Sequence, residues 1–448
     1  MGVVVKQSVQ SMLFTIIGIA LGALINIMSV KYFDKLDFGF TQNLIKITLQ
    51  ISYLGLFGFN YTLLIKGQQY HPDHPARSSL LYVSAIVPLI LTAIITLAFF
   101  IFKPFLLSYY KGENKEMISE YYILFPLFTI LIALFSWLEG YLQSINKSNI
   151  QSFSREILTR IIYISLIVLF AIQLINFKTF IYWYVILYAV PILYLYFHVR
   201  KTKGFVFKFK PELFSKKEIF SLVKFSGYQS FVVLSFVLIL QVDTILLGGL
   251  DIDGFESIAI YSMATFAISI LRNPLRALAN ASVPTLANNY NDNNIKLLQF
   301  NFQKVSVSMQ LASVILSVLM IVNINNIVSF FDFIRPGYDA IQYLIPILLI
   351  GNIIDLFGGM NMEVISSTKY YRFNLVATCI MLVVIIILNY YFIQKMGIIG
   401  AAWATTIGLS IYSIIKIAFL WIKLGVHPFN IQTLKICLLG IGLYCIHL

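Results

Sequence analysis

Charged residues are scarce in this sequence: Asp, Glu, Lys and Arg make up only 11% of its 448 residues. Soluble domains carry about 25% charged residues, because a water-soluble protein has to cover its surface with polar groups. With 59% hydrophobic residues and a mean hydropathy of +0.85, this chain has too few polar groups to do so. The composition therefore argues against a soluble domain and predicts an integral membrane protein.

Cysteine is also scarce. Cys379, Cys437 and Cys445 all lie in apolar runs, which indicates packing rather than a disulfide or metal framework. The sequence shows neither a Ser/His/Asp constellation nor a Gly-rich phosphate-binding loop, and no connection is long enough to hold a separate soluble domain. We therefore expect no enzymatic activity, no metal and no cofactor.

Long apolar runs fill the chain instead. About 20 apolar residues in a helix cross the ~30 Å hydrocarbon core, and backbone amides in lipid have to be paired within their own segment. The first run lacks a small-residue cleavage site and is followed by more spans, so we expect it to be retained. We predict twelve helical spans: 9–31, 41–65, 79–102, 120–144, 156–176, 179–199, 220–248, 257–284, 302–324, 341–363, 372–393 and 398–421.

Basic residues fall unequally on the two sides of these spans. With the N-terminus inside, Lys46 lies within a span and 23 of the 32 Lys and Arg residues lie on the inner side. The outer side holds eight: Lys31, Lys35, Lys103, Lys111, Lys115, Lys178, Arg335 and Lys395. This bias predicts a cytoplasmic N-terminus. The net charge of +13 is therefore interpreted as an orientation signal, and no nucleic-acid partner is expected.

A basic polar connection divides the chain. We predict a six-helix lobe at 1–200, a cytoplasmic linker at 201–219, a second six-helix lobe at 220–425 and a C-terminal segment at 426–448. Two stacked lobes are a common transporter plan. The C-terminal segment resembles the start of a thirteenth span, either because the chain is truncated from a 14-helix protein or because the segment ends in the membrane interface.

Charged residues within the predicted spans are candidates for function, because burying a charge in hydrocarbon costs about 2.5–3.5 kcal/mol; six stand out. They are Lys46, Glu139, Asp243, Arg272, Arg276 and Asp355. Lys46 and Asp243 lie near the outer face, whereas Arg272 and Asp355 lie off-centre towards the cytoplasm. Glu139 is interpreted as a helix-end residue. Asp243 and Asp355 are candidate sites for a coupling cation.

Arg272 and Arg276 are the most suggestive pair. Their spacing of four places both guanidinium groups on one helical face, and Pro274 between them frees a backbone carbonyl. Two Arg forks on one face suit a phosphate, which they bind bidentately. The alternative is that both belong to the cytoplasmic flank and only fix orientation.

Two further motifs carry less weight. His71-Pro72-Asp73-His74 has metal-binding residue types, but its prolines preclude a regular helix, so we interpret it as a solvated loop. Asp251-Ile252-Asp253 has the form of a glycosyltransferase metal-binding pair. It lies on the predicted outer side, away from nucleotide-sugars, which argues against catalysis.

Two stretches carry a family resemblance: KFSGYQSFVVLSFVLILQVDTILLGGL at 224–250, continuing into IAIYSMATFAISI, and MGIIGAAWATTIG at 396–408. They resemble helices seven, eight and twelve of the polysaccharide (O-antigen) flippase family, within the multidrug/oligosaccharidyl-lipid/polysaccharide exporter superfamily. Independently of the resemblance, the small residues of GIIGAAWAT allow close helix approach, and we interpret them as a packing seam.

The resemblance implies an all-α, MATE-like polytopic membrane protein whose two six-helix lobes enclose a central cavity. It implies a flippase that moves an undecaprenyl-pyrophosphate-linked oligosaccharide, such as an O-antigen repeat unit, from the inner to the outer leaflet of the bacterial cytoplasmic membrane by alternating access. Family members have cationic residues in the cavity between the lobes, which implies pyrophosphate binding by Lys46, Arg272 and Arg276. Membrane lipids and other polysaccharide-assembly proteins are the expected partners, and we expect a monomer.

Other functions stay open. A multidrug or small-cation exporter of the same fold is the nearest alternative, and an acidic cavity would favour it. A major-facilitator carrier is disfavoured because the loop KGQQYHPDHPAR after the second span lacks that family's motif. A membrane-embedded glycan polymerase usually has a large outward loop, which this chain lacks. A scaffold without transport activity is a further alternative.

Overall fold

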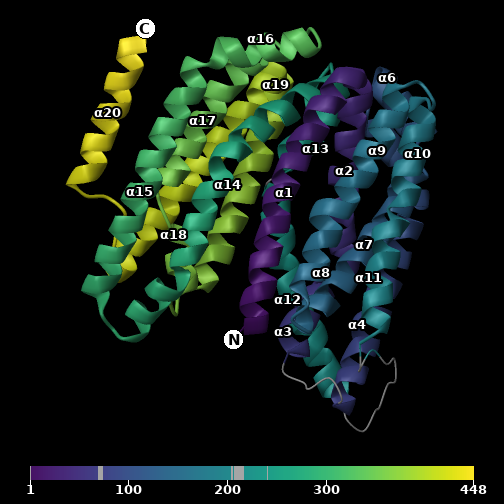
Figure 1. The fold of residues 1–448 in the computed structure, drawn as a ribbon, viewed down its shortest axis with the longest axis horizontal. Coiled ribbons are helices and arrows are strands. Elements are labelled where there is room, and N and C mark those ends of the chain that lie inside the picture. Colours follow the sequence, from purple (N-terminus) through teal and green to yellow (C-terminus); the bar gives the residue numbers. More distant parts are fainter. Residues whose placement is uncertain (1, 69–73, 203–204, 206–215, 240, 448) are drawn as a thin grey trace. The chain divides into compact units, whose positions relative to one another are not determined.

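The computed structural model describes residues 2–68, 74–202, 205, 216–239 and 241–447. These residues form helices joined by short connections, and none of them belongs to a strand. Inter-residue contacts divide the chain into two compact units, Met1–Val237 and Leu238–Leu448. Each unit is an α-helical bundle, coloured purple to teal and teal to yellow in Figure 1.

The longer helices of the first unit overlap the predicted spans, and shorter helices lie between them. They are α1 (Gly2–Tyr32), α2 (Lys35–Leu56), α3 (Phe59–Gly67), α4 (Pro75–Ile101), α5 (Lys103–Tyr109), α6 (Gly112–Glu120), α7 (Leu124–Ser144), α8 (Ser148–Phe153), the π-helix η1 (Ser154–Leu158), α9 (Thr159–Ala171), α10 (Phe177–Leu187), α11 (Ala189–Arg200) and most of α12 (Lys216–Ile239).

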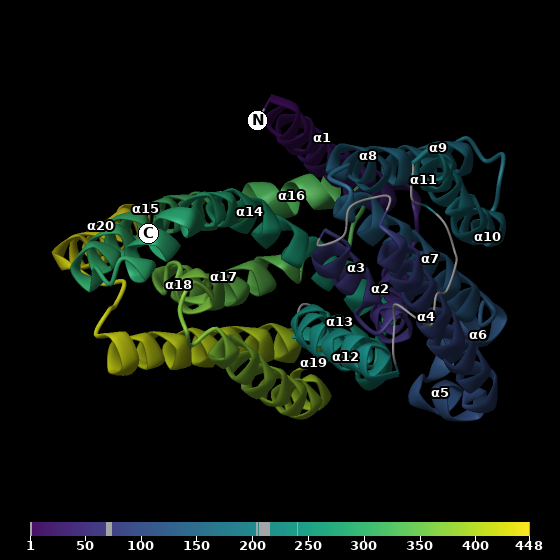
Figure 2. The same ribbon diagram turned by 90° about the horizontal axis from the view of Figure 1, so that it is seen from below.

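The second unit contains the remaining helices. They are α13 (Val242–Leu250), α14 (Phe255–Asn291), α15 (Ile295–Val322), α16 (Ile324–Ile334), α17 (Ile341–Phe357), α18 (Asn361–Ser366), α19 (Arg372–Leu424) and α20 (Ile431–His447). The C-terminal segment thus forms a helix, α20, which packs along α15 (Figure 2).

Within the described ranges, eight helical segments are long and apolar enough to cross a membrane. They overlap nine of the twelve predicted spans, since α19 holds the last two, and span 220–248 is divided between two helices. The other three, 41–65, 156–176 and 341–363, contain helical breaks or a helix of only 17 residues. The break in 41–65 falls at Phe57 and Gly58, which both have positive φ (46° and 73°). Spans can therefore be interrupted without a polar signal in the sequence.

The core of the first unit forms around α7, which contacts α2, α3, α4 and α11. Gly140 on α7 permits this packing, because a Cβ there would lie 2.6 Å from the carbonyl oxygen of Asn60. Large side chains such as Phe135 and Tyr141 fill the space around it. The result is a bundle whose central helix is mostly buried.

Helix α12, the seventh predicted span, packs on the first unit. The hydroxyl groups of Thr62 and Ser226 lie 2.6 Å apart, and a Cβ on Gly58 would lie 2.3 Å from the carbonyl oxygen of Ser226. Contacts therefore divide the chain at Val237, within this helix. The predicted linker, 201–219, lies mostly outside the described residues, so the boundaries drawn at 200 and 220 stay a prediction.

The second unit is organised around α19, which packs on α13 and α17. Gly397 (φ 55°, ψ −134°) marks the break between its two predicted spans. The small-residue stretch that follows packs closely, as the sequence predicts: a Cβ on Gly400 would lie 2.2 Å from the carbonyl oxygen of Phe392. On α17, a Cβ on Gly351 would lie 2.7 Å from the Cα of Thr406.

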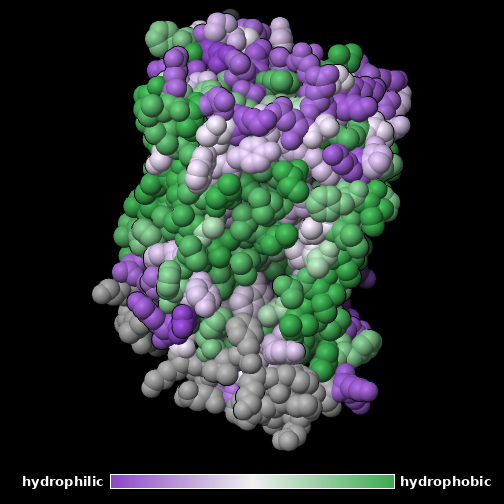
Figure 3. Space-filling model, turned by 90° about the vertical axis from the view of Figure 1, so that its right-hand side faces the viewer, coloured by the Kyte–Doolittle hydropathy of each residue, from purple (hydrophilic) through white to green (hydrophobic). Residues whose placement is uncertain are grey.

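Exposed apolar side chains match a lipid-facing surface. In Figure 3 they cover the middle of the visible face, while hydrophilic residues gather at its upper end. On α4 the exposed residues include Leu89 (67%), Leu97 (60%) and Ile101 (63%). In water such a surface would be an aggregation liability, whereas in a bilayer it is the expected boundary. The chain is thus a multi-pass membrane protein.

Candidate functional site

Asp243 lies in the first turn of α13, just after the break that separates α13 from α12. Only 5% of the residue is exposed. Its Oδ1 accepts a hydrogen bond from the backbone N–H of Thr244 at 2.7 Å, and its Oδ2 accepts from the hydroxyls of Tyr261 at 2.6 Å and Thr405 at 3.2 Å. No Lys or Arg of the described part of the chain pairs with it. Buried carboxylates of this kind mark ion pathways in membrane proteins.

A second charged cluster surrounds Asp355 on α17. Arg272 on α14 donates from Nη2 to Asp355 Oδ2 at 2.9 Å, and Lys416 Nζ on α19 lies 3.9 Å from Asp355 Oδ1. The three side chains are only 19%, 6% and 14% exposed for Arg272, Lys416 and Asp355. Lys416 also lies over the ring of Tyr412 at 3.7 Å from its centroid. Two cations share one carboxylate, so the cluster has a net charge of +1.

A cavity of about 290 Å³ lies beside both groups. Its walls include Asp243 and Thr405, and also Arg272. Asn352, which is 4% exposed, lines the same cavity, and its Oδ1 is buried without a hydrogen-bond partner within the described ranges. Asp355 does not line the cavity itself, but it forms an ion pair with Arg272, which does. The cavity is therefore lined by both an anionic group and a cationic group.

The structure brings three of the five predicted site residues together: Arg272 and Asp355 form an ion pair, and Asp243 shares the cavity with Arg272. Lys46 lies on α2 in the first unit, where it is half-buried, and is not part of this cavity. The side chain of Arg276 lies outside the described residues, so its pairing with Arg272 stays a prediction.

Two further residues, Lys416 and Glu139, lie close to charged partners that the sequence does not predict. Lys416 is one of the 23 basic residues predicted on the inner side, although it lies five residues inside the predicted span 398–421. Glu139 was interpreted as a helix-end residue, but it is 4% exposed and paired with Arg155 in the first unit. No spacing rule predicts that second pair, because its members lie on different helices.

The fold is similar to those of solved membrane transporters. The chain is similar to a multidrug resistance MATE family transporter of the MOP superfamily (TM-score 0.71, 16% identity, 94% of this chain and 96% of that one). It is also similar to the lipid II flippase MurJ (0.70, 15%, 99% and 98%). A MOP superfamily transporter from Pyrococcus furiosus is a third relative (0.60, 16%, 94% and 96%). No curated protein matches the chain.

These similarities define the class: the chain has the helical fold shared by MATE transporters and MurJ, as the sequence predicts. A family model described as polysaccharide biosynthesis protein matches residues 4–290, and a model described as MatE matches residues 230–391. The first match covers well over half of the chain. The chain therefore belongs to the polysaccharide biosynthesis protein family, and the resemblance drawn from the sequence is confirmed.

Proposed function

We propose that the chain is a flippase that moves an undecaprenyl-pyrophosphate-linked oligosaccharide from the inner to the outer leaflet of the bacterial cytoplasmic membrane, by alternating access. Its membership of the polysaccharide biosynthesis protein family supports this cargo class. So does a fold shared with a structure described as a lipid II flippase. The observation that carries the proposal is the buried, net-positive cluster of Arg272, Lys416 and Asp355.

The pyrophosphate of the cargo is proposed to bind Arg272. Asp355 engages one nitrogen of this guanidinium group, which leaves other N–H groups for phosphate oxygens on the cavity side. Lys416 adds a second positive charge that Asp355 alone does not neutralise. A buried excess of positive charge in low-dielectric surroundings favours an anionic ligand. Arg276 and Lys46 stay candidate members of the pyrophosphate site.

The coupling cation is proposed to bind Asp243 rather than Asp355. Asp355 already faces two cations, Arg272 and Lys416, whereas Asp243 faces only hydroxyl and amide donors among the described residues. The hydroxyl oxygen of Thr405 and the unpartnered Oδ1 of Asn352, which lines the same cavity, are further oxygen ligands. Hard cations prefer such oxygen donors.

The main rival, a multidrug or small-cation exporter, draws support from the same Asp243. A cavity with a buried carboxylate attracts a cationic drug as readily as a metal cation. The rival assigns no role to Arg272, which lines the same cavity and whose positive charge favours an anionic cargo. A glycan polymerase is disfavoured because the solved structures that share the fold are described as transporters and a lipid II flippase.

Topology and partners complete the proposal. The inward bias of basic residues supports a cytoplasmic N-terminus, and the exposed apolar surface supports direct contact with membrane lipids. We propose a monomer that works with other polysaccharide-assembly proteins.

Complementation of a flippase-deficient bacterium tests the function. The wild-type chain should restore surface glycan, and Arg272→Ala should reduce export about 10- to 100-fold, the effect of losing a hydrogen bond to a charged group worth about 1.5–3 kcal/mol. Arg200→Ala is the matched control, because Arg200 is exposed at the end of α11. Normal export by an Arg272→Ala/Arg276→Ala variant at normal protein level would rule out the phosphate role. Drug resistance without glycan export would favour the rival.

A further inference from the structure

The first unit contains a second cavity, of about 240 Å³, that the proposed function does not use. It lies where α2 and α3, α7, and the segment from α8 to η1 converge. Its polar lining comes from all three parts of the bundle and includes Asn60, Ser136, Glu139, Gln151 and Arg155. In a membrane-spanning bundle such polar groups are costly unless they are paired or used.

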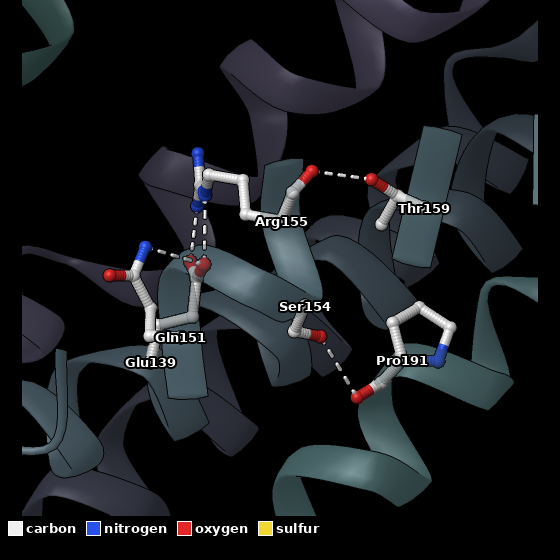
Figure 4. A network of polar contacts seen from close by, with 6 residues as sticks. All are labelled: Glu139, Gln151, Ser154, Arg155, Thr159 and Pro191. Atoms are coloured by element: carbon white, nitrogen blue, oxygen red, sulfur yellow. Dashed lines mark hydrogen bonds and ion pairs between the residues drawn. The ribbon is translucent and has the colours of Figure 1, made fainter. Parts of the chain in front are cut away.

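An ion pair lines this cavity, and its members, Glu139 and Arg155, are drawn in Figure 4. Arg155 donates from Nε to Glu139 Oε1 at 2.8 Å, and its Nη2 contacts Glu139 Oε2, so the pair is bidentate. Gln151 Nε2 donates a third hydrogen bond to Glu139 Oε1 at 3.0 Å. The carboxylate is therefore fully matched, and the two formal charges cancel.

A π-helical turn holds Arg155 in place. Residues Ser154–Leu158 form η1 between α8 and α9, and π-turns are rare features that often occur at functional sites. Ser154 donates to the carbonyl of Pro191 at 3.4 Å, and Thr159 donates to the carbonyl of Arg155 at 2.5 Å (Figure 4). These contacts fix the backbone from which the guanidinium group extends.

Three polar groups around the cavity lack a protein partner within the described ranges. Ser136 is 3% exposed and its Oγ has no hydrogen bond. Asn60 Oδ1 is buried and equally unpartnered. The third nitrogen of Arg155 points away from Glu139 in Figure 4, and no hydrogen bond uses it. Buried polar groups without a partner, here those of Ser136 and Asn60, are usually satisfied by a ligand or water. The side chain of Arg155 is 40% exposed, and its third nitrogen adds a hydrogen-bond donor at the same cavity.

We propose that this cavity binds a single ring of a neutral sugar. A cancelled ion pair has no net attraction for an anion or a cation, but both of its members still accept or donate hydrogen bonds. Hydroxyl groups are the ligand that can do both, since each donates and accepts. The volume lies below the roughly 300–1,000 Å³ of drug-sized pockets, which limits the ligand to about one ring.

The remaining lining agrees with this ligand. Tyr53 and Tyr61 supply apolar ring surface together with hydroxyl groups, and Gln143 adds a further amide. The identity of the ligand as part of the cargo rests on the proposed function, because a lipid-linked oligosaccharide carries such rings. The binding site itself rests only on the cavity and its unpartnered groups.

Saturation-transfer NMR on the full chain in detergent micelles tests the inference directly. The probes are free glucose and two charged analogues of the same ring, glucuronate and glucosamine. Glucose should give a saturable signal, and both charged analogues should give a weaker one. Ser136→Ala should weaken glucose binding about threefold to tenfold, the effect of one hydrogen bond. Ser165→Ala is the matched control, because its hydroxyl is exposed on α9 and bonded to Ile161.

The outcomes separate this inference from the proposed function. No glucose signal from the folded wild-type chain, or stronger binding of a charged analogue, would overturn the inference, and a cavity that holds only water gives the first result. Glycan export without sugar binding would support the flippase function and contradict the sugar site. Sugar binding without export in the complementation assay would support the sugar site and contradict the proposed flippase function. Ser136→Leu, which fills the cavity, should abolish the glucose signal.

Discussion

The two units use the same kinds of charged side chain in different proportions. In the first unit one carboxylate, Glu139, matches one guanidinium group, Arg155, through bidentate contacts. In the second unit one carboxylate, Asp355, faces Arg272 and Lys416, and the longer contact is 3.9 Å. The first arrangement is neutral and tightly bonded, whereas the second has a spare positive charge.

This difference teaches how buried charge selects a ligand. A buried pair that is balanced contributes hydrogen bonds without net charge, and it suits a neutral polar ligand. A buried cluster with unequal numbers of positive and negative groups keeps a net charge. Where that charge is positive, an anion stabilises it. The proposals above therefore assign a neutral sugar ring to the cavity of the first unit and a phosphate group to that of the second.

Removing the guanidinium group of the first unit should give the largest effect on stability. Arg155→Met leaves Glu139, whose side chain is 5% exposed, with only the amide of Gln151. Breaking a fully buried pair costs about 3–5 kcal/mol. Because the side chain of Arg155 is 40% exposed, we expect a loss at or below the lower end of this range, measured by thermal unfolding in detergent. A Glu139→Leu/Arg155→Met double variant should recover most of it. Equal losses in the single and double variants would contradict a balanced, isolated pair.

The equivalent change in the second unit should cost less. Arg272→Met leaves Asp355 with Lys416 as a remaining partner, so we expect a loss of about 1–2 kcal/mol, within the usual range for point mutants. The same thermal unfolding assay measures it. A loss as large as that of Arg155→Met would mean that Lys416 does not compensate, and that the comparison of the two clusters is wrong.

Asp243 offers a third point of comparison, a carboxylate with no cationic partner among the described residues. A cation that binds it stabilises the folded chain by RT ln(1 + [L]/Kd), about 2.7 kcal/mol at 100 times Kd. Raising Na⁺ at constant ionic strength should therefore increase the melting temperature of the wild-type chain but not of Asp243→Asn. Asp253→Asn, at an exposed position, is the matched control and should respond like wild type. An unchanged response in Asp243→Asn would exclude this site; if wild type also ignores Na⁺, a proton is the remaining candidate.

The smallest effect concerns Asp251, in the loop between α13 and α14. Burial raises the pKa of this carboxyl above its ordinary value of 3.8, and the nearby Asp253 adds to the rise. Since the folded chain then binds the proton more readily, stability is lost as pH rises through the raised pKa, and the full cost is present at neutral pH. Asp251→Asn keeps the acceptor for the N–H of Ile252.

We therefore expect Asp251→Asn to raise the melting temperature slightly at pH 7, by less than about 1 kcal/mol in stability, within the range of surface substitutions. The gain should shrink as pH falls towards the ordinary carboxyl range. A gain that is constant with pH, or a loss at pH 7, would show that the charge of Asp251 is not the cause.

Hydropathy alone predicted the location of the helices, because lipid exposure imposes a 20-residue apolar run on each crossing. It did not predict the break at Phe57 and Gly58, which depends on backbone geometry and on the close approach of Ser226. It also did not predict that α12 packs on the first unit, since that depends on contacts distant in sequence, such as Thr62 with Ser226.

The candidate site was predicted only in part, because contacts between residues distant in sequence cannot be derived from hydropathy. Charged residues inside apolar runs stand out singly, so Arg272, Asp355 and Asp243 could be selected from the sequence. Their partners could not, because the pairing of Arg272 with Asp355 joins α14 to α17 and that of Glu139 with Arg155 joins α7 to η1. Lys416 was missed because a basic residue near a span end also fits the flank.

The central claim is that Arg272 holds the pyrophosphate of a lipid-linked oligosaccharide during its movement across the bilayer. Purified chain in proteoliposomes, with fluorescent undecaprenyl-pyrophosphate oligosaccharide in the membrane, measures this movement through the fraction that a membrane-impermeant quencher reaches over time. We predict rapid exchange for wild type and Arg200→Ala, and exchange at least tenfold slower for Arg272→Ala. Equal rates for wild type and Arg272→Ala, or a wild-type rate no faster than protein-free liposomes, would contradict the claim.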